Sequence, residues 1–322
     1  MVRHMTPDVV TLGEALVGLV AEDSSPLSEV ATFRRYIVGA EANVAVGLTR
    51  LGRSVAFVGR VGEDGFGTAV ARRLRAEGVD VAAVAVDKAA PTGILVRERR
   101  RLGPSEVVYH RRGSAGSRLS PVDVDAVADL VRSARWLHLT GITPALSPTA
   151  QAAVERAFGL AREGDGVISL DVNLRRKLWA DDEARMELWP LASRVDVVLG
   201  DVDELTVIAG GDDAPGRLLE AGVRTVVVKL GAGGARIHDE TGAALAVSAL
   251  TVADVVDPVG AGDAFCAGFI AARLEGLDYQ TCLRWANACG AAVVSVPGDM
   301  DGLPTRAELE RLLADPGRDT LR

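Results

Sequence analysis

Lysine is scarce in this sequence of 322 residues: only Lys88, Lys177 and Lys229 occur, and arginine supplies nearly all of the 36 basic side chains. The net charge is −8 and no basic tract offsets it, which argues against a nucleic-acid partner. No apolar run reaches the roughly 18 residues of a transmembrane helix, so we expect no membrane span. The N-terminus lacks a charged region followed by an apolar core, which disfavours secretion and is typical of a cytoplasmic protein.

Cysteine is equally rare. Cys266, Cys282 and Cys289 form an odd set without ligand spacing, and all three lie in alanine-rich segments that read as helices. Such thiols are usually small core residues, so we expect neither a disulfide nor a zinc site. His138 lies in an apolar strand pattern over 136–139, where a buried, hydrogen-bonded imidazole is favoured over a functional one.

Three common catalytic motifs are also missing. None of the lysines follows a glycine, so the Gly-Lys-[Ser/Thr] of a P-loop is absent. The dinucleotide fingerprint G-x-G-x-x-G is absent, because Gly260-Ala261-Gly262 continues into Asp-Ala-Phe. There is no Gly-x-Ser-x-Gly nucleophile elbow. P-loop phosphotransfer is therefore excluded, and hydride transfer and serine hydrolysis are disfavoured.

Short apolar runs alternate with amphipathic stretches along most of the chain. Strands are predicted at 9–12, 55–58, 136–139, 167–170, 195–199 and 225–229. Helices are predicted at 41–51, 67–77, 122–133, 148–163, 182–193, 202–209, 214–221, 263–275, 279–294 and 305–313. Continuous Val/Ile/Leu strands separated by helices indicate an α/β fold with a mainly parallel central sheet flanked by helices. Ligands of such folds bind beyond the carboxyl ends of the strands.

Two segments, approximately 14–38 and 91–112, depart from this alternation with half-polar, β-favouring stretches. We expect them to form a small β-sheet that projects from one α/β domain over 6–314 and covers a site as a lid. A small sheet of this kind has a face to hide, which a second subunit could cover. The sequence therefore favours a homo-oligomer assembled through the lid.

The most informative segment is 257–265, Asp-Pro-Val-Gly-Ala-Gly-Asp-Ala-Phe. Gly260-Ala261-Gly262 allows a tight turn, and the apolar run that follows predicts a helix whose N-terminal N–H groups suit an anion. Asp263 then stands where a carboxylate could take a proton from an attacking hydroxyl. The alternative is a glycine turn with an aspartate that caps a helix, which is common in α/β proteins.

Four further clusters follow predicted strands or open helices. Each has an ordinary structural explanation, such as turn chemistry or solvated arginines. Together they favour one site for two anionic ligands. They are 39–43 (Gly-Ala-Glu-Ala-Asn), 109–117 with Tyr109 and Arg111, 171–175 (Asp-Val-Asn-Leu-Arg), and 229–234 (Lys-Leu-Gly-Ala-Gly-Gly).

These motifs carry a family resemblance. Residues 257–269 resemble the C-terminal signature of the ribokinase-like (PfkB) carbohydrate kinases, and 39–43 with 58–67 resemble their N-terminal signature. The resemblance runs from Val9 to Leu313. Within the family, 113–117, 138–147 and 169–173 resemble the 2-keto-3-deoxygluconate kinases. This implies the ribokinase-like fold and ATP- and Mg²⁺-dependent phosphorylation of 2-keto-3-deoxygluconate at its 6-hydroxyl.

The resemblance also implies roles for individual residues. Asp263 is expected to be the base and Gly260, Ala261 and Gly262 the anion hole for the transferring phosphoryl group. The sugar acid is expected to contact Gly39, Asn43, Tyr109, Arg111, Arg175, Asp263 and Asp299. The nucleotide is expected near Asn173, Arg175, Lys229, Gly231, Gly233, Gly234 and Asn287, with Glu204 acting on the metal ion indirectly.

Three positions depart from the family pattern. Asp201 replaces the amide of an Asn-x-x-Glu motif, while Glu204 keeps its carboxylate. Leu95 stands where related keto-acid kinases can have a tyrosine, and His110 replaces a common aromatic. The C4 epimer of the sugar acid, the ion requirements and the oligomer size stay open. The alternatives are another sugar kinase of the family (a fructokinase, a ribokinase or a dual gluconate/galactonate keto-acid kinase), or a non-catalytic sugar-acid or nucleotide sensor.

Overall fold

The computed structural model describes residues 6–99 and 106–314, so the part of the second lid segment at 100–105 lies outside the described residues. A large sheet has the strand order β13-β12-β11-β10-β9-β8-β1-β4-β5. All of its neighbouring strands pair in parallel except β11 with β12 and β12 with β13. Its strands are β1 (Val9–Leu12), β4 (Val55–Gly62), β5 (Val84–Asp87), β8 (Trp136–Thr140), β9 (Val167–Asp171), β10 (Val197–Asp201), β11 (Thr225–Lys229), β12 (Ala235–Asp239) and β13 (Ala244–Val247).

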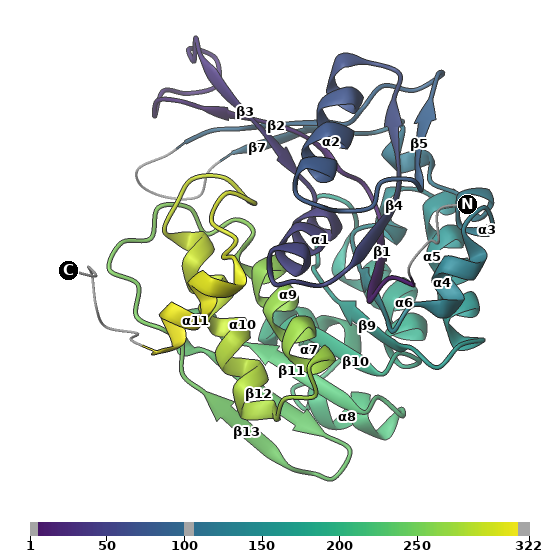
Figure 1. Ribbon diagram of the computed structural model, residues 1–322, viewed down its shortest axis with the longest axis vertical. Coiled ribbons are helices and arrows are strands. Elements are labelled where there is room, and N and C mark those ends of the chain that lie inside the picture. The colour runs from purple at the N-terminus through teal and green to yellow at the C-terminus, as the bar shows by residue number, and fades with distance from the viewer. Residues whose placement is uncertain (1–5, 100–105, 315–322) are drawn as a thin grey trace.

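A second sheet of order β3-β2-β6-β7 projects beyond one end of the large sheet (Figure 1). Its β2–β6 pair is parallel and its other two pairs are antiparallel. The chain enters and leaves this small sheet twice, as the two departures from the strand–helix alternation predicted. Its strands are β2 (Leu16–Ala21), β3 (Phe33–Val38), β6 (Ile94–Arg97) and β7 (Val107–His110).

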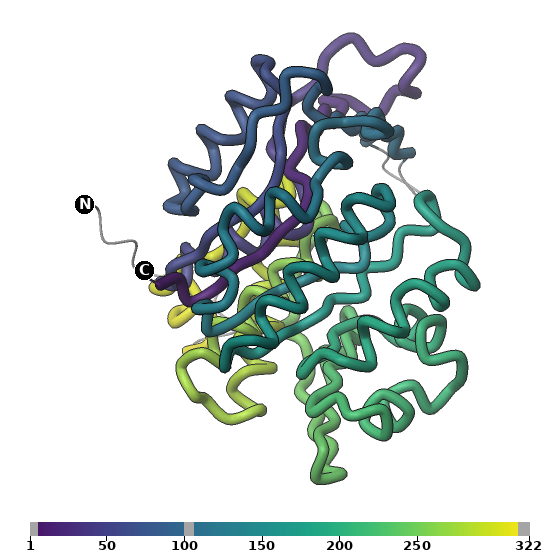
Figure 2. The backbone as a smooth tube through the Cα atoms, turned by 90° about the vertical axis from the view of Figure 1, so that its right-hand side faces the viewer, coloured from purple at the N-terminus to yellow at the C-terminus, as the bar shows by residue number. Residues whose placement is uncertain are grey.

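Helices cover both faces of the large sheet, and two apolar cores lie between the layers. Figure 2 shows the yellow-green C-terminal helices and the teal helices of the middle of the chain on opposite sides. One face carries α1 (Ala40–Arg50), α2 (Gly65–Ala76), α9 (Ala261–Leu274), α10 (Tyr279–Val294) and α11 (Arg306–Ala314). The other carries α3 (Pro121–Asp125), α4 (Ala128–Ser133), α5 (Pro148–Arg162), α6 (Asp181–Ala192), α7 (Val202–Ala209) and α8 (Ala214–Glu220). Short 3-10 turns lie at η1 (Gly116–Arg118), η2 (Pro144–Leu146) and η3 (Gly231–Gly233).

The mainly parallel sheet and its six predicted strands are confirmed. The helix predicted over 122–133 is wrong as a single element. It is divided into α3 and α4, because Val127 leaves the helical region with φ −127° and ψ 27°. The prediction missed β5, β12 and β13, which are short and only partly buried. Helix α9 begins at Ala261, two residues earlier than predicted, so the glycine turn belongs to its first turn.

The rare residues lie where the sequence predicted them. Cys266, Cys282 and Cys289 are buried in α9 and α10. His138 is fully buried and its Nδ1 lies 2.9 Å from Ser169 Oγ. Burial lowers the pKa of His138 to about 4, so the imidazole is neutral near pH 7. Within 6–99 and 106–314, no helix is both long and apolar enough to cross a membrane.

Candidate functional site

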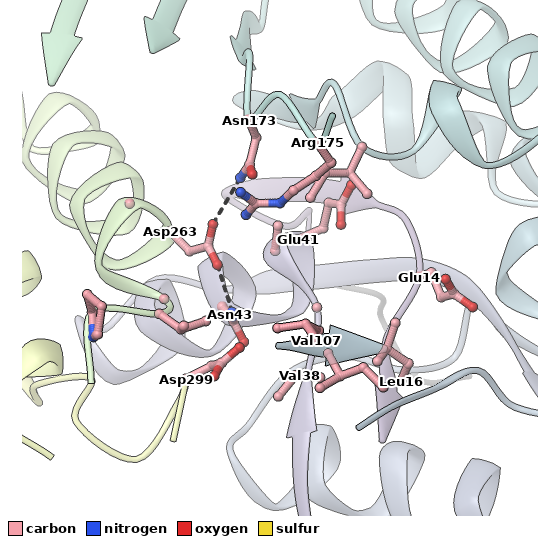
Figure 3. A pocket seen from close by; sticks show the side chains of 18 of the residues that line it. Glu14, Leu16, Val38, Glu41, Asn43, Val107, Asn173, Arg175, Asp263 and Asp299 are labelled. Atoms are coloured by element: carbon pink, nitrogen blue, oxygen red, sulfur yellow. Dashed lines mark hydrogen bonds between the residues drawn. The ribbon is translucent and has the colours of Figure 1, made fainter. Parts of the chain in front are cut away.

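A cavity of about 580 Å³ lies beyond the carboxyl ends of the central strands, where open α/β sheets bind ligands. Its lining combines the segment after β9, the N-terminal end of α9, and side chains from the small sheet, among them Leu16, Leu95 and Tyr109. Figure 3 shows Leu16, Asn173 and Asp263 among the side chains around this space. Its size is typical of a small-molecule site. The small sheet therefore forms part of the cavity wall.

Asp263 lies at the base of this cavity, in the first turn of α9, and only 6% of it is exposed. Its Oδ2 accepts a hydrogen bond from Asn43 Nδ2 at 2.7 Å, and its Oδ1 accepts one from Asn173 Nδ2 at 3.2 Å (Figure 3). Burial raises the pKa of Asp263 to about 7, although Asn43 and the charge of Arg175 oppose the rise. A carboxylate with this pKa can accept a proton near neutral pH.

Asn173 is held in an unusual conformation. Its φ is +41°, which makes it the one non-glycine residue of the described chain with a positive φ. Asparagine tolerates this left-handed region better than most residues. The turn follows β9 and lets Nδ2 also reach Asp171 Oδ2 at 3.3 Å. The amide of Asn173 thus lies between two carboxylates, those of Asp171 and Asp263.

Lys229 lies behind this group. Its Nζ donates to Asp171 Oδ1 at 2.6 Å and lies 3.8 Å from Glu204 Oε2. Burial, the largest single effect, would lower the pKa of the Lys229 ammonium, but the nearby carboxylates of Asp171 and Glu204 and the other groups around it together raise that pKa. Lys229 therefore stays charged and compensates the buried carboxylate of Asp171.

The N-terminal end of α9 has the features of an anion site. Gly260 precedes the helix with φ +84°, and a Cβ there would lie 2.7 Å from the carbonyl oxygen of Asp299. Only glycine fits this turn without strain. No side chain caps the helix. The N–H of Ala261 donates to the carbonyl oxygen of Pro258 at 3.4 Å, and those of Gly262 and Asp263 are left for a ligand. The cradle fits a phosphate group.

Most cations around the cavity are already paired. Arg111 donates from Nε to Glu14 Oε2 at 2.6 Å, and its Nη2 lies at the same distance from that oxygen. Arg97 pairs with Asp257 and lies 3.9 Å from Asp299. Arg175 also lines the cavity, and it is exposed. It forms no ion pair with any residue of 6–99 or 106–314. Its guanidinium extends toward Asp263 (Figure 3).

Asp299 is the second acidic group of the cavity wall, and 7% of it is exposed. Burial raises the pKa of Asp299 to about 6, against the opposing charge of Arg97. The site thus holds two carboxyl groups that titrate near neutral pH. Perturbed carboxyl groups of this kind concentrate at functional sites.

The structure brings most of the predicted site residues together. The cavity is lined by Gly39, Asn43, Tyr109, Arg111, Asn173, Arg175, Glu204, Lys229, Gly231, Gly260, Gly262, Asp263 and Asp299. Four predicted residues do not line it: Ala261, Gly233, Gly234 and Asn287. Ala261 is the first residue of α9. Asn287 donates from Nδ2 to the carbonyl oxygens of Val247 and Ser248, both at 3.1 Å, so its amide supports the chain at the end of β13.

The departures from the family pattern have separate explanations. Asp201 caps α7: its Oδ1 accepts the N–H of Glu204 at 2.8 Å, a bond that an amide oxygen could also accept. Glu204 in turn accepts the N–H groups of Asp201 and Leu174, both at 2.9 Å. Leu95 lines the cavity with an apolar side chain, and His110 is exposed at the end of β7, outside the lining.

Three charged residues of the lining received no individual role from the sequence: Glu14, Glu41 and Arg97. Glu41 is buried, and its Oε1 accepts the hydroxyl of Thr140 at 2.6 Å. Burial raises the pKa of Glu41. Glu14 follows a predicted strand and could have been found by that position, whereas Arg97 is brought to the cavity only by the pairing of β6 with β2.

No group of three or more His, Cys, Asp or Glu side chains in the described part of the chain could hold a metal ion by itself. Both carboxylate oxygens of Glu204 already accept backbone N–H groups. A metal ion at this site would therefore need ligands from a bound anion and from water, which is the usual arrangement for Mg²⁺ with phosphates.

Comparisons with known proteins agree with this geometry. The model of the pfkB family of carbohydrate kinases matches residues 6–306. The chain is 42% identical to the 2-dehydro-3-deoxygluconokinase of Thermoproteus tenax, over 95% of this chain and 94% of that protein. It is 36% identical to the protein of the same name from Bacillus subtilis strain 168, over 96% of each. A crystal structure of a putative ribokinase II from E. coli, in complex with ATP and Mg²⁺, superimposes with a TM-score of 0.89 at 30% identity, covering 96% of this chain and 99% of that chain.

The chain therefore belongs to the pfkB family of carbohydrate kinases, as the two signature segments predicted. Its fold is ribokinase-like.

Proposed function

We propose that this protein transfers the γ-phosphoryl group of ATP to the 6-hydroxyl of 2-keto-3-deoxygluconate. The observation that carries the proposal is the position of Asp263, a buried carboxylate with a pKa of about 7 at the anion-binding end of α9. The two relatives cited above are named for this activity and match nearly the full chain, which supports the choice of substrate.

In the proposed reaction Asp263 orients the sugar hydroxyl and accepts its proton as the oxygen attacks phosphorus. The amides of Asn43 and Asn173 hold the carboxylate in one orientation from two sides. The N-terminal N–H groups of α9, next to Gly260, Ala261 and Gly262, would stabilise the charge on the phosphoryl oxygens. The main contribution of the protein would then be to position the hydroxyl and the phosphoryl group, without a covalent intermediate on the enzyme.

Arg175 supports recognition of anions. It is the cation of the lining whose donors have no carboxylate partner among the described residues, and it lies beside Asp263. A planar guanidinium can bind a carboxylate or a phosphate through two hydrogen bonds. Tyr109 and Arg111 would contact the sugar acid from the small sheet, and Gly39, Asn43 and Asp299 from the body. This local positive charge lets an acidic protein hold an acidic substrate.

ATP with Mg²⁺ would lie between α9 and the segment after β11, near Lys229 and Gly231. A bound metal ion would neutralise part of the charge of the phosphates. Because Glu204 is engaged with backbone N–H groups, we assign it a contact through water. Gly233, Gly234 and Asn287 lie outside the cavity lining and would shape the outer nucleotide site near the end of β13.

The small sheet would act as a lid within a single domain over 6–314. Closing it excludes water, which otherwise competes with the sugar as phosphoryl acceptor. We propose that its outer face pairs with a second copy of the chain and that the enzyme works in the cytoplasm. Light scattering of the purified protein tests the first point: a monomer at micromolar concentration contradicts it.

The test of the function is an ADP-release assay over a panel of sugars. We expect the highest kcat/KM for 2-keto-3-deoxygluconate or its C4 epimer. Faster turnover of fructose, ribose or a nucleoside would overturn the substrate assignment and leave a sugar kinase. Binding of sugar acid and ATP without turnover of any sugar would indicate a sensor.

A further inference from the structure

Glu14 has a position that the proposed reaction does not explain. It lies between β1 and β2, where the chain leaves the large sheet for the small one, and only 2% of it is exposed. In Figure 3 it lies on the far side of the cavity from Asp263. Buried glutamates are rare unless their charge is paired, so a glutamate at this position requires partners for its carboxylate.

The carboxylate of Glu14 is fully engaged. Oε2 accepts from Nε of Arg111 at 2.6 Å and lies 2.6 Å from its Nη2, while Oε1 accepts the hydroxyl of Ser114. Arg111 in turn lies over the ring of Tyr109, with its Cζ 5.6 Å from the ring centroid. The guanidinium is therefore fixed by Glu14 on one edge and flanked by an aromatic ring.

The backbone leaves a slot for this side chain. A Cβ at Gly93 would lie 2.5 Å from Glu14 Oε1, and a Cβ at Gly116 would overlap its Cγ. A Cβ at Gly39 would lie 2.5 Å from the carbonyl oxygen of Glu14 itself. Glycine at these three positions gives Glu14 room that any other residue would fill.

Four segments connect the small sheet to the large sheet and its helices, and Glu14 lies in or against each of them. The chain crosses at 13–15 into β2, at Gly39 out of β3, at 88–93 into β6 and at 111–115 out of β7. Glu14 lies in the first crossing. Its side chain binds Arg111 and Ser114 in the last crossing and lies against Gly93 in the third, while its main-chain carbonyl lies against Gly39 in the second. A backbone hydrogen bond from Val17 N to Gly93 O, 3.0 Å long, joins two of the crossings.

We infer that Glu14 is a positioning residue whose side chain joins three of the four hinge segments that connect the small sheet to the large one, and that it orients Arg111 toward the substrate. The inference rests on the proposed function for the role of Arg111. Because Glu14 occupies the Nε–Nη2 edge of the guanidinium, the opposite edge is presented to a bound anion. Glu14 thus couples the position of the small sheet to recognition of the sugar acid without touching the sugar.

The test compares Glu14→Gln, which keeps the shape of the side chain, with Glu77→Gln as a matched control. Glu77 accepts from Arg50 at 2.9 and 2.8 Å and lies outside the cavity; 17% of its side chain is exposed, against 1% for Glu14. We expect Glu14→Gln to raise the KM for the sugar about tenfold, with kcat changed less than twofold and the KM for ATP unchanged. Glu77→Gln should lower the melting temperature and leave all three constants unchanged.

A double-mutant cycle with Arg111→Leu isolates the connection, since residues that act through one another give non-additive effects. Adding Glu14→Gln to Arg111→Leu should not raise the KM further. Additive increases would overturn the inference. So would a Glu14→Gln variant that is only less stable, with an unchanged KM.

Hydrogen exchange provides a readout that needs no substrate. In Glu14→Gln the amides of β2 and β6 should exchange at least tenfold faster than in the wild type and in Glu77→Gln. Unchanged exchange would overturn the hinge role. The cycle is run on whichever sugar the wild type phosphorylates fastest. If the substrate assignment is wrong, the wild-type enzyme will prefer another sugar in the panel. If the role of Glu14 is wrong, only the comparison of the variants with the wild type will show it.

Discussion

Asn43 and Asp263 are 220 positions apart in the chain, and their side chains are joined by a 2.7 Å hydrogen bond from Nδ2 to Oδ2. Asn43 lies in α1, directly after the small sheet returns to the body, and Asp263 opens α9. The bond links the exit of the lid to the proposed base. The amide oxygen of Asn43 is buried and has no hydrogen-bond partner among the described residues.

Replacing Asp263 by Asn tests its role as the base. Because removal of a general base typically costs about 10²–10⁴-fold in rate, we expect kcat to fall by that factor. Calorimetry should show ATP and the sugar acid still binding within a few-fold of the wild type. Asp278→Asn is the control, since Asp278 caps α10 and lies outside the cavity. A kinase rate unchanged in Asp263→Asn would contradict the mechanism.

The pH dependence of the rate follows from the pKa of Asp263, which burial raises to about 7. The base must be deprotonated, so kcat/KM should fall about tenfold per pH unit below that value. Bound phosphates would raise this midpoint further in the ternary complex. An acidic limb with a midpoint near pH 4, the ordinary value for aspartate, would show that the carboxyl group is solvated during catalysis.

The same shift predicts an effect on stability. The pKa of Asp263 is raised from 3.8 in the unfolded chain to about 7 in the folded one, and that of Asp299 to about 6. The folded state therefore binds protons more tightly, and its free energy of unfolding decreases as pH rises from about 4 through 7. We expect the melting temperature to fall more between pH 5 and 8 in the wild type than in Asp263→Asn. If the melting temperature fell equally with pH in both proteins, the raised pKa of Asp263 would be contradicted.

Much of this site could be predicted from local sequence. The glycine turn before Asp263 and the strand-end cluster at 171–175 indicate backbone geometry directly, so their place beside the cavity could be predicted. The position of Glu14 after a predicted strand could be read from the sequence. Its pairing with Arg111 and the place of Arg97 could not, because each depends on a contact between segments about 100 or more residues apart. The strand β13 was missed for a related reason: its Ala-Leu-Ala-Val sequence is short, and pairing with β12 decides its conformation.

Gly260 offers a matched pair of variants with Gly52. Both have φ +84°, but a Cβ at Gly260 would meet the Asp299 carbonyl at 2.7 Å, whereas Gly52 has open space. Alanine at either position should lower stability by about 1 kcal/mol through backbone strain, and Gly260→Ala should cost more because its Cβ also meets the Asp299 carbonyl. Only Gly260→Ala should also raise the KM for ATP and reduce kcat, because it displaces the first turn of α9. Equal kinetic loss in both variants would mean that strain alone is being measured.

Arg175 tests how the acidic substrate is recognised. Since hydrogen bonds to charged groups contribute about 1.5–3 kcal/mol, Arg175→Leu should reduce kcat/KM for the keto-deoxy acid by about 10- to 150-fold. Its effect on a neutral sugar of the same length should be much smaller if Arg175 binds the carboxylate. Arg111→Leu should discriminate less between the two sugars, because Glu14 already compensates the charge of Arg111. If Arg175→Leu instead reduces turnover of both sugars equally and raises the KM for ATP, its anion is the phosphate, and recognition of the sugar acid must come from the small sheet.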